Sequence, residues 1–354
     1  GILMTEGCRG EGGILVNRDG YRYLQDYGLG PLDPWPRPKA MELGPRDRLS
    51  QAFWHERQKG RTVDTPHGPA VHLDLRHLGE KKIHERLPLI AEAAETFAGV
   101  DPVKDPIPVC PAVHYTMGGI LTDGRCQTPI QGLFAAGECS SVGIHGANRL
   151  GSNSLAELLV FGRLAGEGAA TVAAERGRGQ ADTAMLKQAE DAERRILTWL
   201  DPTRNAGPGA ERSATIRDEM RVAMEDGVGI YRDEKGMQAT CDKLAELRER
   251  YRRVRIDDHS LAFNTDWLTT LELGYSLEVA QAMAHSALQR KESRGAHQRL
   301  DGYTERDDAQ FMKHSLAHYT GDGAPDITLQ PVVITKSQPR ARVYGGAGKK
   351  AEMS

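Results

Sequence analysis

HGANRLGSNSLAELLVFGRLAG, residues 145–166, joins a polar, glycine-rich loop directly to a run that is almost entirely apolar. A helix start carries unsatisfied backbone N–H groups and a partial positive charge, and Gly151 lets another group approach the backbone closely. Ser152, Asn153 and Ser154 are all suitable N-cap residues. The stretch therefore predicts either a well-capped core helix or a binding site for an anionic group. Because the helix is apolar on most faces, we expect other elements to cover it on several sides.

The segment before this loop favours the binding site. HYTMGGILT, residues 114–122, and LFAAGE, residues 133–138, are predicted strands separated by a turn-rich stretch. LFAAGE is nearly continuous in its apolar character, as buried parallel strands are. Glu138 would stand at the carboxyl end of that strand, where open α/β sheets bind ligands and where a carboxylate commonly holds a ribose hydroxyl.

The rest of the chain predicts further helices around this segment. A proline-rich surface loop at 30–45 precedes a helix from Arg46 through Trp54, and Pro45 suits a helix start. Beyond residue 182 the pattern indicates a small antiparallel bundle, followed by a strand-like PVVIT at 331–335. Its four predicted helices are Ala184–Leu200, Ala214–Met224, Met237–Tyr251 and Thr265–Gln289. In the third, apolar residues recur at three- and four-residue spacing, namely Met237, Cys241, Leu244, Leu247 and Tyr251.

Composition excludes several classes of function. The 354 residues are enough for two or three domains, and 46 basic against 49 acidic residues give a net charge of -3. With no long run of one sign, the chain is not predicted to bind nucleic acid or an anionic membrane surface. No apolar run approaches the roughly 18–20 residues of a membrane span, and the start does not resemble a signal peptide. Five scattered cysteines argue against a disulfide framework or a metal site and favour a reducing compartment: Cys8, Cys110, Cys126, Cys139 and Cys241.

These residues resemble a known family. The run from 114 to 167, together with TEGCRGEGGILVN, GYRYLQDY, ELGPRD, LDLRHLGE and KESRGAHQRLD, is similar in the same order to the flavoprotein subunit of bacterial quinol:fumarate reductase. That subunit belongs to the succinate dehydrogenase/fumarate reductase flavoprotein family. Family members begin with a dinucleotide-binding βαβ unit and carry a histidine linked covalently to FAD, and neither is present here. A further active-site histidine upstream of GILMTEG is also missing, so the resemblance implies the carboxyl-terminal portion of a longer subunit.

The resemblance implies hydride transfer from reduced FAD to fumarate, giving succinate in anaerobic respiration. Arg46 matches the family's proton donor, and Glu6 and Arg9 match the relay that reprotonates it. Free arginine is a poor acid, so its site has to stabilise the neutral form briefly. An ordinary salt bridge between Glu6 and Arg9 is the alternative. The matching substrate residues are Thr5, His114 and Arg149, and those facing FAD are Glu138, Ser154 and Leu155. Taken singly, these residues also fit structural roles.

The implied fold is α/β plus α. It comprises a partial capping domain at 1–110, the end of a Rossmann-like FAD-binding domain at 111–175, a helical bundle at 182–290 and a small C-terminal domain with a tail at 291–354. Closure of the cap over the FAD domain would assemble the site. The cluster Arg294, His297 and Arg299 is interpreted as structural pairing. Cys8 is either a reactive thiol beside Arg9 or a buried inert one.

The implied partners are fumarate or succinate, an iron–sulfur subunit and, through it, membrane anchor subunits. The subunit would lie at the cytoplasmic face of the inner membrane without entering it. Succinate dehydrogenase and L-aspartate oxidase flavoproteins remain alternatives within the family. A non-catalytic fragment is the alternative of another class, and we expect the chain alone to be inactive.

Overall fold

The computed structural model describes residues 2–29, 41–66, 68–177, 179, 181–336 and 338–339. Most of the predicted proline-rich loop and most of the polar tail lie outside these ranges. The chain divides into two compact units. The first runs to His114 and includes the residues from Ile334 onward, and the second is Tyr115–Val333. The four-part division expected from the sequence stays a prediction.

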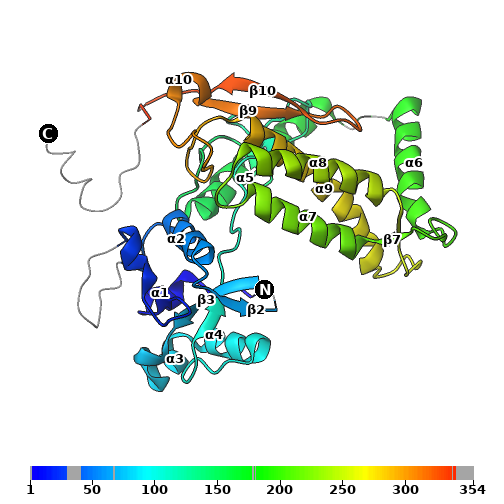
Figure 1. Cartoon of the computed structure of the whole chain (residues 1–354). Coiled ribbons are helices and arrows are strands. Elements are labelled where there is room, and N and C mark those ends of the chain that lie inside the picture. The colour runs from blue at the N-terminus through cyan, green and yellow to red at the C-terminus, as the bar shows by residue number, and fades with distance from the viewer. Residues whose placement is uncertain are drawn as a thin grey trace. The chain divides into compact units, whose positions relative to one another are not determined.

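The first unit combines a small antiparallel sheet with short helices (Figure 1). Its elements are α1 (Glu6–Gly10), β1 (Ile14–Val16), η1 (Tyr23–Tyr27), α2 (Arg46–Gln58), β2 (Val63–Thr65), β3 (Gly68–Asp74), η2 (Arg76–Leu78), α3 (Glu80–Arg86), α4 (Pro88–Ala93), η3 (Ala94–Ala98) and β4 (Ile107–Val109). Helix α2 begins at Arg46 as predicted, with Pro45 at its N-cap, and continues four residues past Trp54.

Strand β3 organises this sheet because β1, β2 and β4 all pair with it. Leu73 lies opposite Leu15 in β1 and Ile107 in β4. Leu73 and Ile107 are buried with Cys8 against residues of α3 and α4. Val71 belongs to a second cluster formed with η1 and α2. The sheet thus ties α1 and α2, which carry the predicted proton donor and its relay, to a common core.

The second unit is mainly helical. Its elements are β5 (Ile120–Leu121), β6 (Ser140–Ser141), α5 (Asn153–Arg176), α6 (Thr183–Leu197), η4 (Thr198–Leu200), β7 (Glu211–Arg212), α7 (Ser213–Val228), α8 (Glu234–Tyr251), β8 (Val254–Arg255), α9 (Thr265–Gln289), α10 (Asp308–Phe311), β9 (Lys313–His318) and β10 (Asp326–Pro331). Helix α9 has the predicted bounds, while α7 and α8 extend the predicted helices by a few residues.

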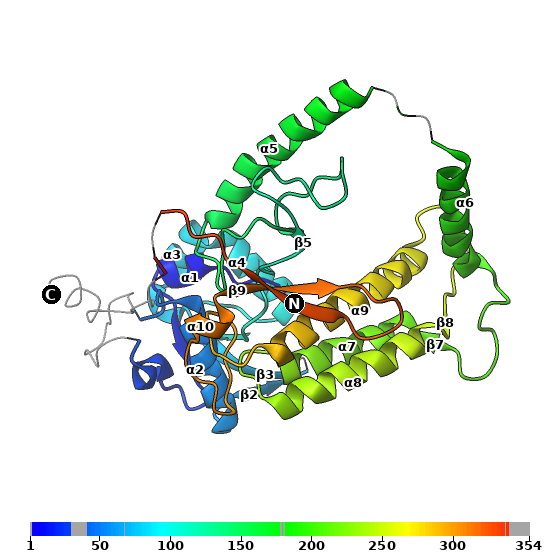
Figure 2. The same ribbon diagram turned by 90° about the horizontal axis from the view of Figure 1, so that it is seen from above.

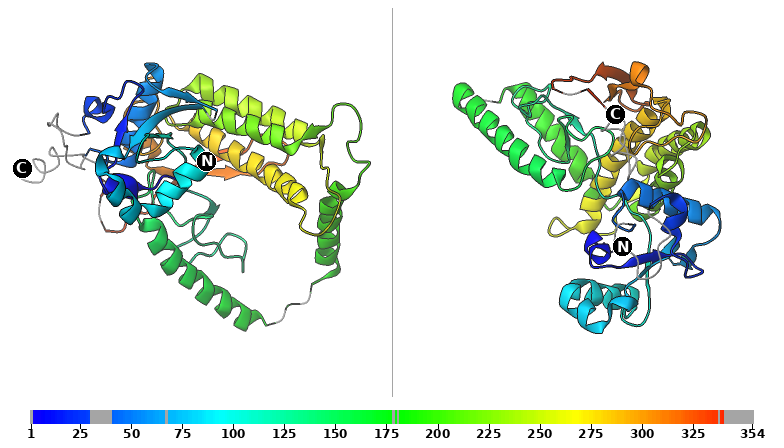
Figure 3. Two further views of the ribbon diagram at one scale, coloured as in Figure 1. Left: turned by 90° about the horizontal axis from the view of Figure 1, so that it is seen from below. Right: turned by 90° about the vertical axis from the view of Figure 1, so that its left-hand side faces the viewer.

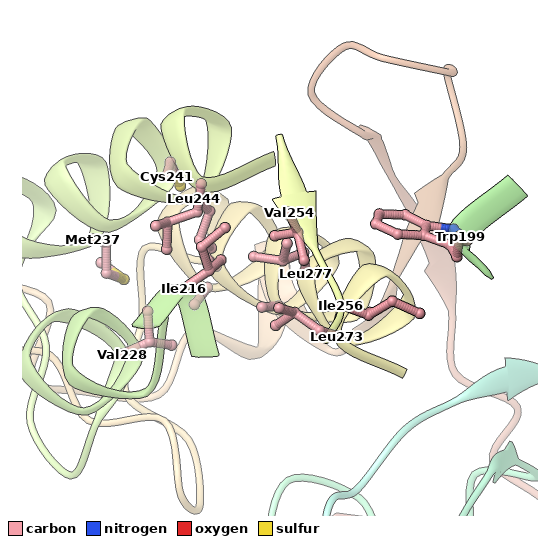
Figure 4. Packing of buried hydrophobic residues seen from close by; sticks show 14 residues of the cluster. Trp199, Ile216, Val228, Met237, Cys241, Leu244, Val254, Ile256, Leu273 and Leu277 are labelled. Atoms are coloured by element: carbon pink, nitrogen blue, oxygen red, sulfur yellow. The ribbon is translucent and has the colours of Figure 1, made fainter. Parts of the chain in front are cut away.

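Helices α7, α8 and α9 form the bundle core (Figure 4). The apolar stripe of α8 is confirmed, since Met237, Cys241, Leu244 and Leu247 are all buried and Tyr251 packs against the same cluster. Full burial of a side chain such as Leu244 contributes about 1.5–3 kcal/mol. The bundle is the larger of the hydrophobic clusters in the described chain, and it gives the second unit its rigid part.

Helix α6 was expected in this bundle, and that expectation is wrong. None of its residues, all of which the structure describes, is buried, and it stands apart from α7–α9 (Figure 2). Its end is nevertheless attached to the core. Trp199 in η4 packs into the bundle cluster, and the indole N–H of Trp267 donates to the carbonyl of Ile196 at 3.2 Å. The amphipathic pattern of α6 predicted a helix correctly but not its neighbours.

The predicted buried strand LFAAGE is also not formed. Leu133 is 48% exposed, and Phe134 makes an isolated bridge to Gln127. The parallel pairing instead joins Ile120 and Leu121 to Ser140 and Ser141, just after Glu138. Within the described ranges this sheet has two strands. Parallel strands are stable when helices and further strands cover them. The pair formed by β5 and β6 is too short for this, so the strand does not extend through residues 133–138.

Helix α5 also differs from what its sequence predicts. It was expected to be covered on several sides, yet apolar residues along it are exposed, among them Leu155 at 65% and Leu159 at 77%. Within α5, all of which the structure describes, Glu157 alone is buried. The apolar pattern therefore marks a surface rather than a core in this chain.

Strands β9 and β10 form an antiparallel hairpin that lies along α9 (Figure 3). The predicted strand PVVIT overlaps this hairpin only at Pro331, where β10 ends. Arg248 of α8 fixes the hairpin turn by donating to the carbonyls of Gly321 and Asp322. No helix in the described part of the chain is long and apolar enough to cross a membrane.

Candidate active site

The predicted proton donor and its relay meet in the first unit. Arg46 donates through Nε and Nη2 to the same carboxylate oxygen of Glu6, at 2.8 and 2.7 Å. Nη2 of Arg9 lies 3.9 Å from that oxygen. The three side chains therefore form a chain in which one carboxylate stands between two guanidinium groups.

Short elements of the sheet unit position this cluster. Glu6 opens α1 and Arg46 opens α2, so both side chains project from the first turn of a helix. Arg9 is held from its other side, since Nη1 donates to the carbonyl of Glu42 at 2.8 Å. The Glu42 carboxylate is in turn paired with Arg22 in a buried salt bridge. Arg9 is consequently fixed, while Glu6 and Arg46 remain about half exposed.

Burial changes the acidity of Arg9. Removal of water lowers its pKa, and the nearby Arg46 cation lowers it further, against the opposing effect of Glu6. A guanidinium with a lowered pKa releases its proton more readily than one in water. The three side chains predicted to form the relay therefore lie in sequence, with Glu6 between Arg9 and Arg46.

Thr5 and His114 are exposed side chains of the same unit. Thr5 occupies the N-cap of α1, where its carbonyl accepts from the N–H of Cys8 at 3.2 Å and its hydroxyl makes no capping bond. Cys8 is fully buried, and burial raises the pKa of its thiol despite the neighbouring Arg9. Of the two alternatives for Cys8, the structure supports the inert one.

Arg149 lies in the loop that precedes α5 in the second unit. Its Nη1 donates to the carbonyl of Leu150 at 3.0 Å, and its guanidinium carbon lies 4.6 Å from the ring centroid of Tyr115. Nε is buried and has no hydrogen-bond partner among the described residues. A half-buried guanidinium whose buried Nε donor is unused is suited to holding an anion.

A hydrogen-bonded group beside Arg149 was not predicted from the sequence. Glu157 accepts from the hydroxyl of Tyr115 and from Nε2 of His145, both at 2.6 Å. The signal that could have found it is the single carboxylate inside the apolar run LAELLVF, because a buried acid needs donors nearby. Tyr115 and His145 flank the loop whose Arg149 was predicted.

The start of α5 has an irregular geometry. Ser152 adopts a left-handed conformation with φ 64°, and the N–H of Leu155 donates to its carbonyl at 3.1 Å. Ser154 lies in the first turn of the helix between these two residues. Glu138 is exposed, and one of its oxygens accepts from the N–H of Thr116 at 2.8 Å.

The loop carrying Arg149 is supported from behind by a distant segment. The N–H of Ala296 donates to the carbonyl of Ala147 at 2.9 Å. Gly295 has φ +59°, and a Cβ there would collide with the carbonyl of Ala147 and lie 2.8 Å from its Cβ. The two backbones therefore approach as closely as glycine permits.

Buried ion pairs hold the supporting segment, as the predicted structural pairing requires. Glu292 is fully buried and accepts from Arg294 at 2.8 Å and from Arg290 at 2.6 Å. His297 accepts from Arg232 through Nδ1 and donates through Nε2 to the carbonyl of Arg290. Burial, and then the Arg232 cation, lower the pKa of His297 to about 4. Arg299 completes the cluster by pairing with Asp301.

Comparison with known proteins finds two family models. The model described as FAD binding domain matches residues 1–155, and the one described as fumarate reductase flavoprotein C-term matches residues 217–344. No group of three or more metal-ligating side chains is placed to hold an ion in the described ranges.

Comparison with individual proteins also finds fumarate reductase and succinate dehydrogenase flavoprotein subunits. The chain is 63% identical to the fumarate reductase flavoprotein subunit of Serratia sp., over 100% of this chain and 59% of that protein. It is 42% identical to the succinate dehydrogenase flavoprotein subunit of Coxiella burnetii, over 97% of this chain and 57% of that one. A solved structure of a mutant E. coli quinol fumarate reductase matches with a TM-score of 0.89 and 63% identity, covering 98% of this chain and 59% of its own. The mixed helix and sheet fold thus matches that structure, and the chain spans about three fifths of the length of its relatives.

Proposed function

Because the chain belongs to the succinate dehydrogenase/fumarate reductase flavoprotein family, we propose that it supplies the proton donor, the substrate clamp and part of the FAD site of a fumarate reductase flavoprotein subunit. The proposed reaction adds a hydride and a proton across the alkene of fumarate, giving succinate. The complete protein would carry out this reaction in anaerobic respiration, with an iron–sulfur subunit and membrane anchor subunits as partners.

FAD is the cofactor of this family and supplies the hydride when bound. The residues at the start of α5 fit one edge of it. A Cβ at Gly118, Gly146 or Gly151 would meet nothing within 4 Å, so the loops there leave open space. The exposed carboxylate of Glu138 is suited to a ribose hydroxyl. The first turn of the 24-residue helix, at Ser154 and Leu155, favours a negative group.

Arg46 is the proposed proton donor, and its contacts with Glu6 support this role most directly. A surface ion pair of this kind contributes only about 0–1 kcal/mol to stability, so stability alone gives little reason for the arrangement. When Arg46 gives a proton to the substrate carbon, Arg9, whose pKa is lowered by burial, can protonate the Glu6 carboxylate that lies 3.9 Å from its Nη2. Glu6 can then pass that proton to the neutral Arg46 across the 2.7 Å contact.

Arg149 is the proposed clamp for a substrate carboxylate, and Thr5 and His114 are the other proposed substrate residues. The observation that supports it is the buried Nε with no partner in the described chain. A guanidinium binds a carboxylate through two parallel hydrogen bonds, and Nε is one of the donors that such a pair uses. A fixed cation also stabilises the negative charge that develops as the hydride arrives.

The choice of fumarate reductase over its relatives rests on similarity, since the Serratia subunit is 63% identical and the Coxiella succinate dehydrogenase subunit 42%. A second candidate is a chain that binds a partner but does not turn over substrate by itself. The exposed apolar face of α5 favours it, because such surfaces normally lie against another protein surface.

The test joins the part of the Serratia subunit that lies outside the match to this chain and assays the chimera with FAD and reduced viologen. We expect a retained flavin absorption band and fumarate-dependent viologen oxidation. Arg46→Gln should lower that rate by about 10³-fold, the range for loss of a general acid. Arg48→Gln is the control, because Arg48 lies on the same helix turn and donates to Gln51 at 3.2 Å.

The 354-residue chain alone, incubated with FAD and desalted, is assayed beside the chimera. We expect no turnover from it. A chimera that binds flavin yet reduces fumarate equally well with Arg46→Gln would refute the assignment of the proton donor. A chimera without fumarate-dependent turnover would refute the proposed activity, and turnover by the isolated chain would refute the second candidate.

A further inference from the structure

Glu157 is buried in a helix that is otherwise exposed. It is 2% exposed, while Leu158 and Leu159 beside it are 51% and 77% exposed. A buried carboxylate costs several kcal/mol unless donors surround it. Its side chain therefore points away from the apolar face of α5, toward the loop that carries Arg149.

Two donors satisfy this carboxylate. Tyr115 and His145 both reach Oε2 at 2.6 Å, and their own polar atoms lie 3.3 Å apart. The two rings meet edge to face, with centroids 5.2 Å apart and an interplanar angle of 84°. Burial, and then the bond to Glu157, raise the pKa of Tyr115 to about 12. The phenol thus remains a hydrogen-bond donor throughout the neutral range.

The guanidinium of Arg149 lies over the ring of Tyr115. The guanidinium carbon lies 4.6 Å from the ring centroid, which is within cation–π distance. The hydroxyl at one end of the ring is bound to Glu157, which fixes the position of the ring over which the guanidinium lies. His145 starts the same loop four residues earlier, and its bond to Glu157 fixes the loop backbone as well.

We propose that Glu157 is a positioning residue for the dicarboxylate site: by binding Tyr115 and His145 it holds Arg149 in the orientation that receives a carboxylate. The identity of the ligand rests on the proposed function, whereas the positioning itself concerns only residues of this unit. Loss of the Glu157 charge should make the side chain of Arg149 more mobile.

In the first experiment, phenylglyoxal is added to the folded 354-residue chain. Mass spectrometry of the peptides from that chain then gives the rate at which Arg149 is modified. Glu157→Gln and Tyr115→Phe should each raise the rate several-fold, because both release the ring that shields the guanidinium. Glu167→Gln is the matched control, since Glu167 lies on the same helix and pairs with Arg163 on the surface. Rates within twofold of the unmodified chain in both variants would overturn the proposal. Tyr115→Phe removes a single oxygen, so the test stands even if Glu157→Gln fails to fold.

The second experiment measures succinate binding by calorimetry. Glu157→Gln should weaken it by about tenfold, the size of one well-formed cation–π or charge-assisted contact. In an Arg149→Gln background the same change should have no further effect, because Glu157 acts through Arg149. An equal loss in both backgrounds would show a general structural role and overturn the proposal. If the unmodified chain binds no succinate, the clamp of the proposed function fails in this chain, while the phenylglyoxal rates still decide the positioning.

Discussion

Replacing Gly295 with alanine tests how closely the segment behind the Arg149 loop is fitted. An alanine at φ +59° would occupy the left-handed region, which costs about 1–2 kcal/mol. Its Cβ would also collide with the carbonyl of Ala147 and lie 2.8 Å from the Cβ of that residue. The carbonyl cannot simply move, because it accepts from Ala296 at 2.9 Å. Overpacking of this kind costs about a further 1–3 kcal/mol. We therefore expect a loss of about 3 kcal/mol in unfolding free energy.

The control is Gly302→Ala. Gly302 also has a positive φ, +94°, but a Cβ there meets nothing within 4 Å, so only the conformational cost of about 1–2 kcal/mol applies. Urea unfolding of both variants gives the free energies, and hydrogen exchange of the peptide spanning residues 143–151 shows whether the loop loosens. If Gly295→Ala and Gly302→Ala lose the same stability and the loop exchanges no faster, the close approach does not hold Arg149.

Two further predictions concern the second unit. Gly227→Ala in α7 should destabilise the bundle by about 1–2 kcal/mol in urea unfolding, because a Cβ 2.5 Å from the carbonyl of Gly236 outweighs the gain of about 1 kcal/mol in helix propensity. Gly162→Ala in α5, with open space around it, should stabilise by about 0.5–1 kcal/mol, and a gain at both positions would contradict this packing. His297 stays neutral in the fold down to pH about 4 but binds a proton in the unfolded chain below its ordinary pKa of 6.5, so its contribution is complete above pH 6.5. Stability should therefore fall by about 3 kcal/mol between pH 6.5 and 4 relative to His297→Gln, which keeps both hydrogen bonds without titrating. If the unfolding free energies of the two proteins change with pH in the same way, this prediction for His297 is refuted.

Periodicity was sufficient where a helix buries one stripe. Met237, Cys241, Leu244 and Leu247 follow the three- and four-residue spacing of a helix face, and all four are in the bundle core. The bounds of α9 followed from the helical pattern, and the structure adds that the side chain of Asn264 caps the helix by accepting from Trp267. Local signals of this kind do not depend on which other elements are present.

Sequence patterns were less informative where burial depends on the presence of other helices or strands. LFAAGE and α5 have the composition of buried elements, but burial is a property of the surroundings and not of the segment. The same limit applies to the site. The cluster of Glu6, Arg9 and Arg46 followed from a resemblance, whereas the bonds from Tyr115 and His145 to Glu157 join residues 42 and 12 positions apart and have no local sequence signature.

The contact between Ala147 and Gly295 also bears on the order in which the protein matures. The two residues are separated by about 150 positions, so the Arg149 loop is synthesised long before its support exists. At roughly 5–20 residues per second, translation takes about 7 to 30 s to reach Gly295. During that interval Arg149 has only its nearby partners. The loop consequently gains its support late, after the helical bundle between these residues has been synthesised.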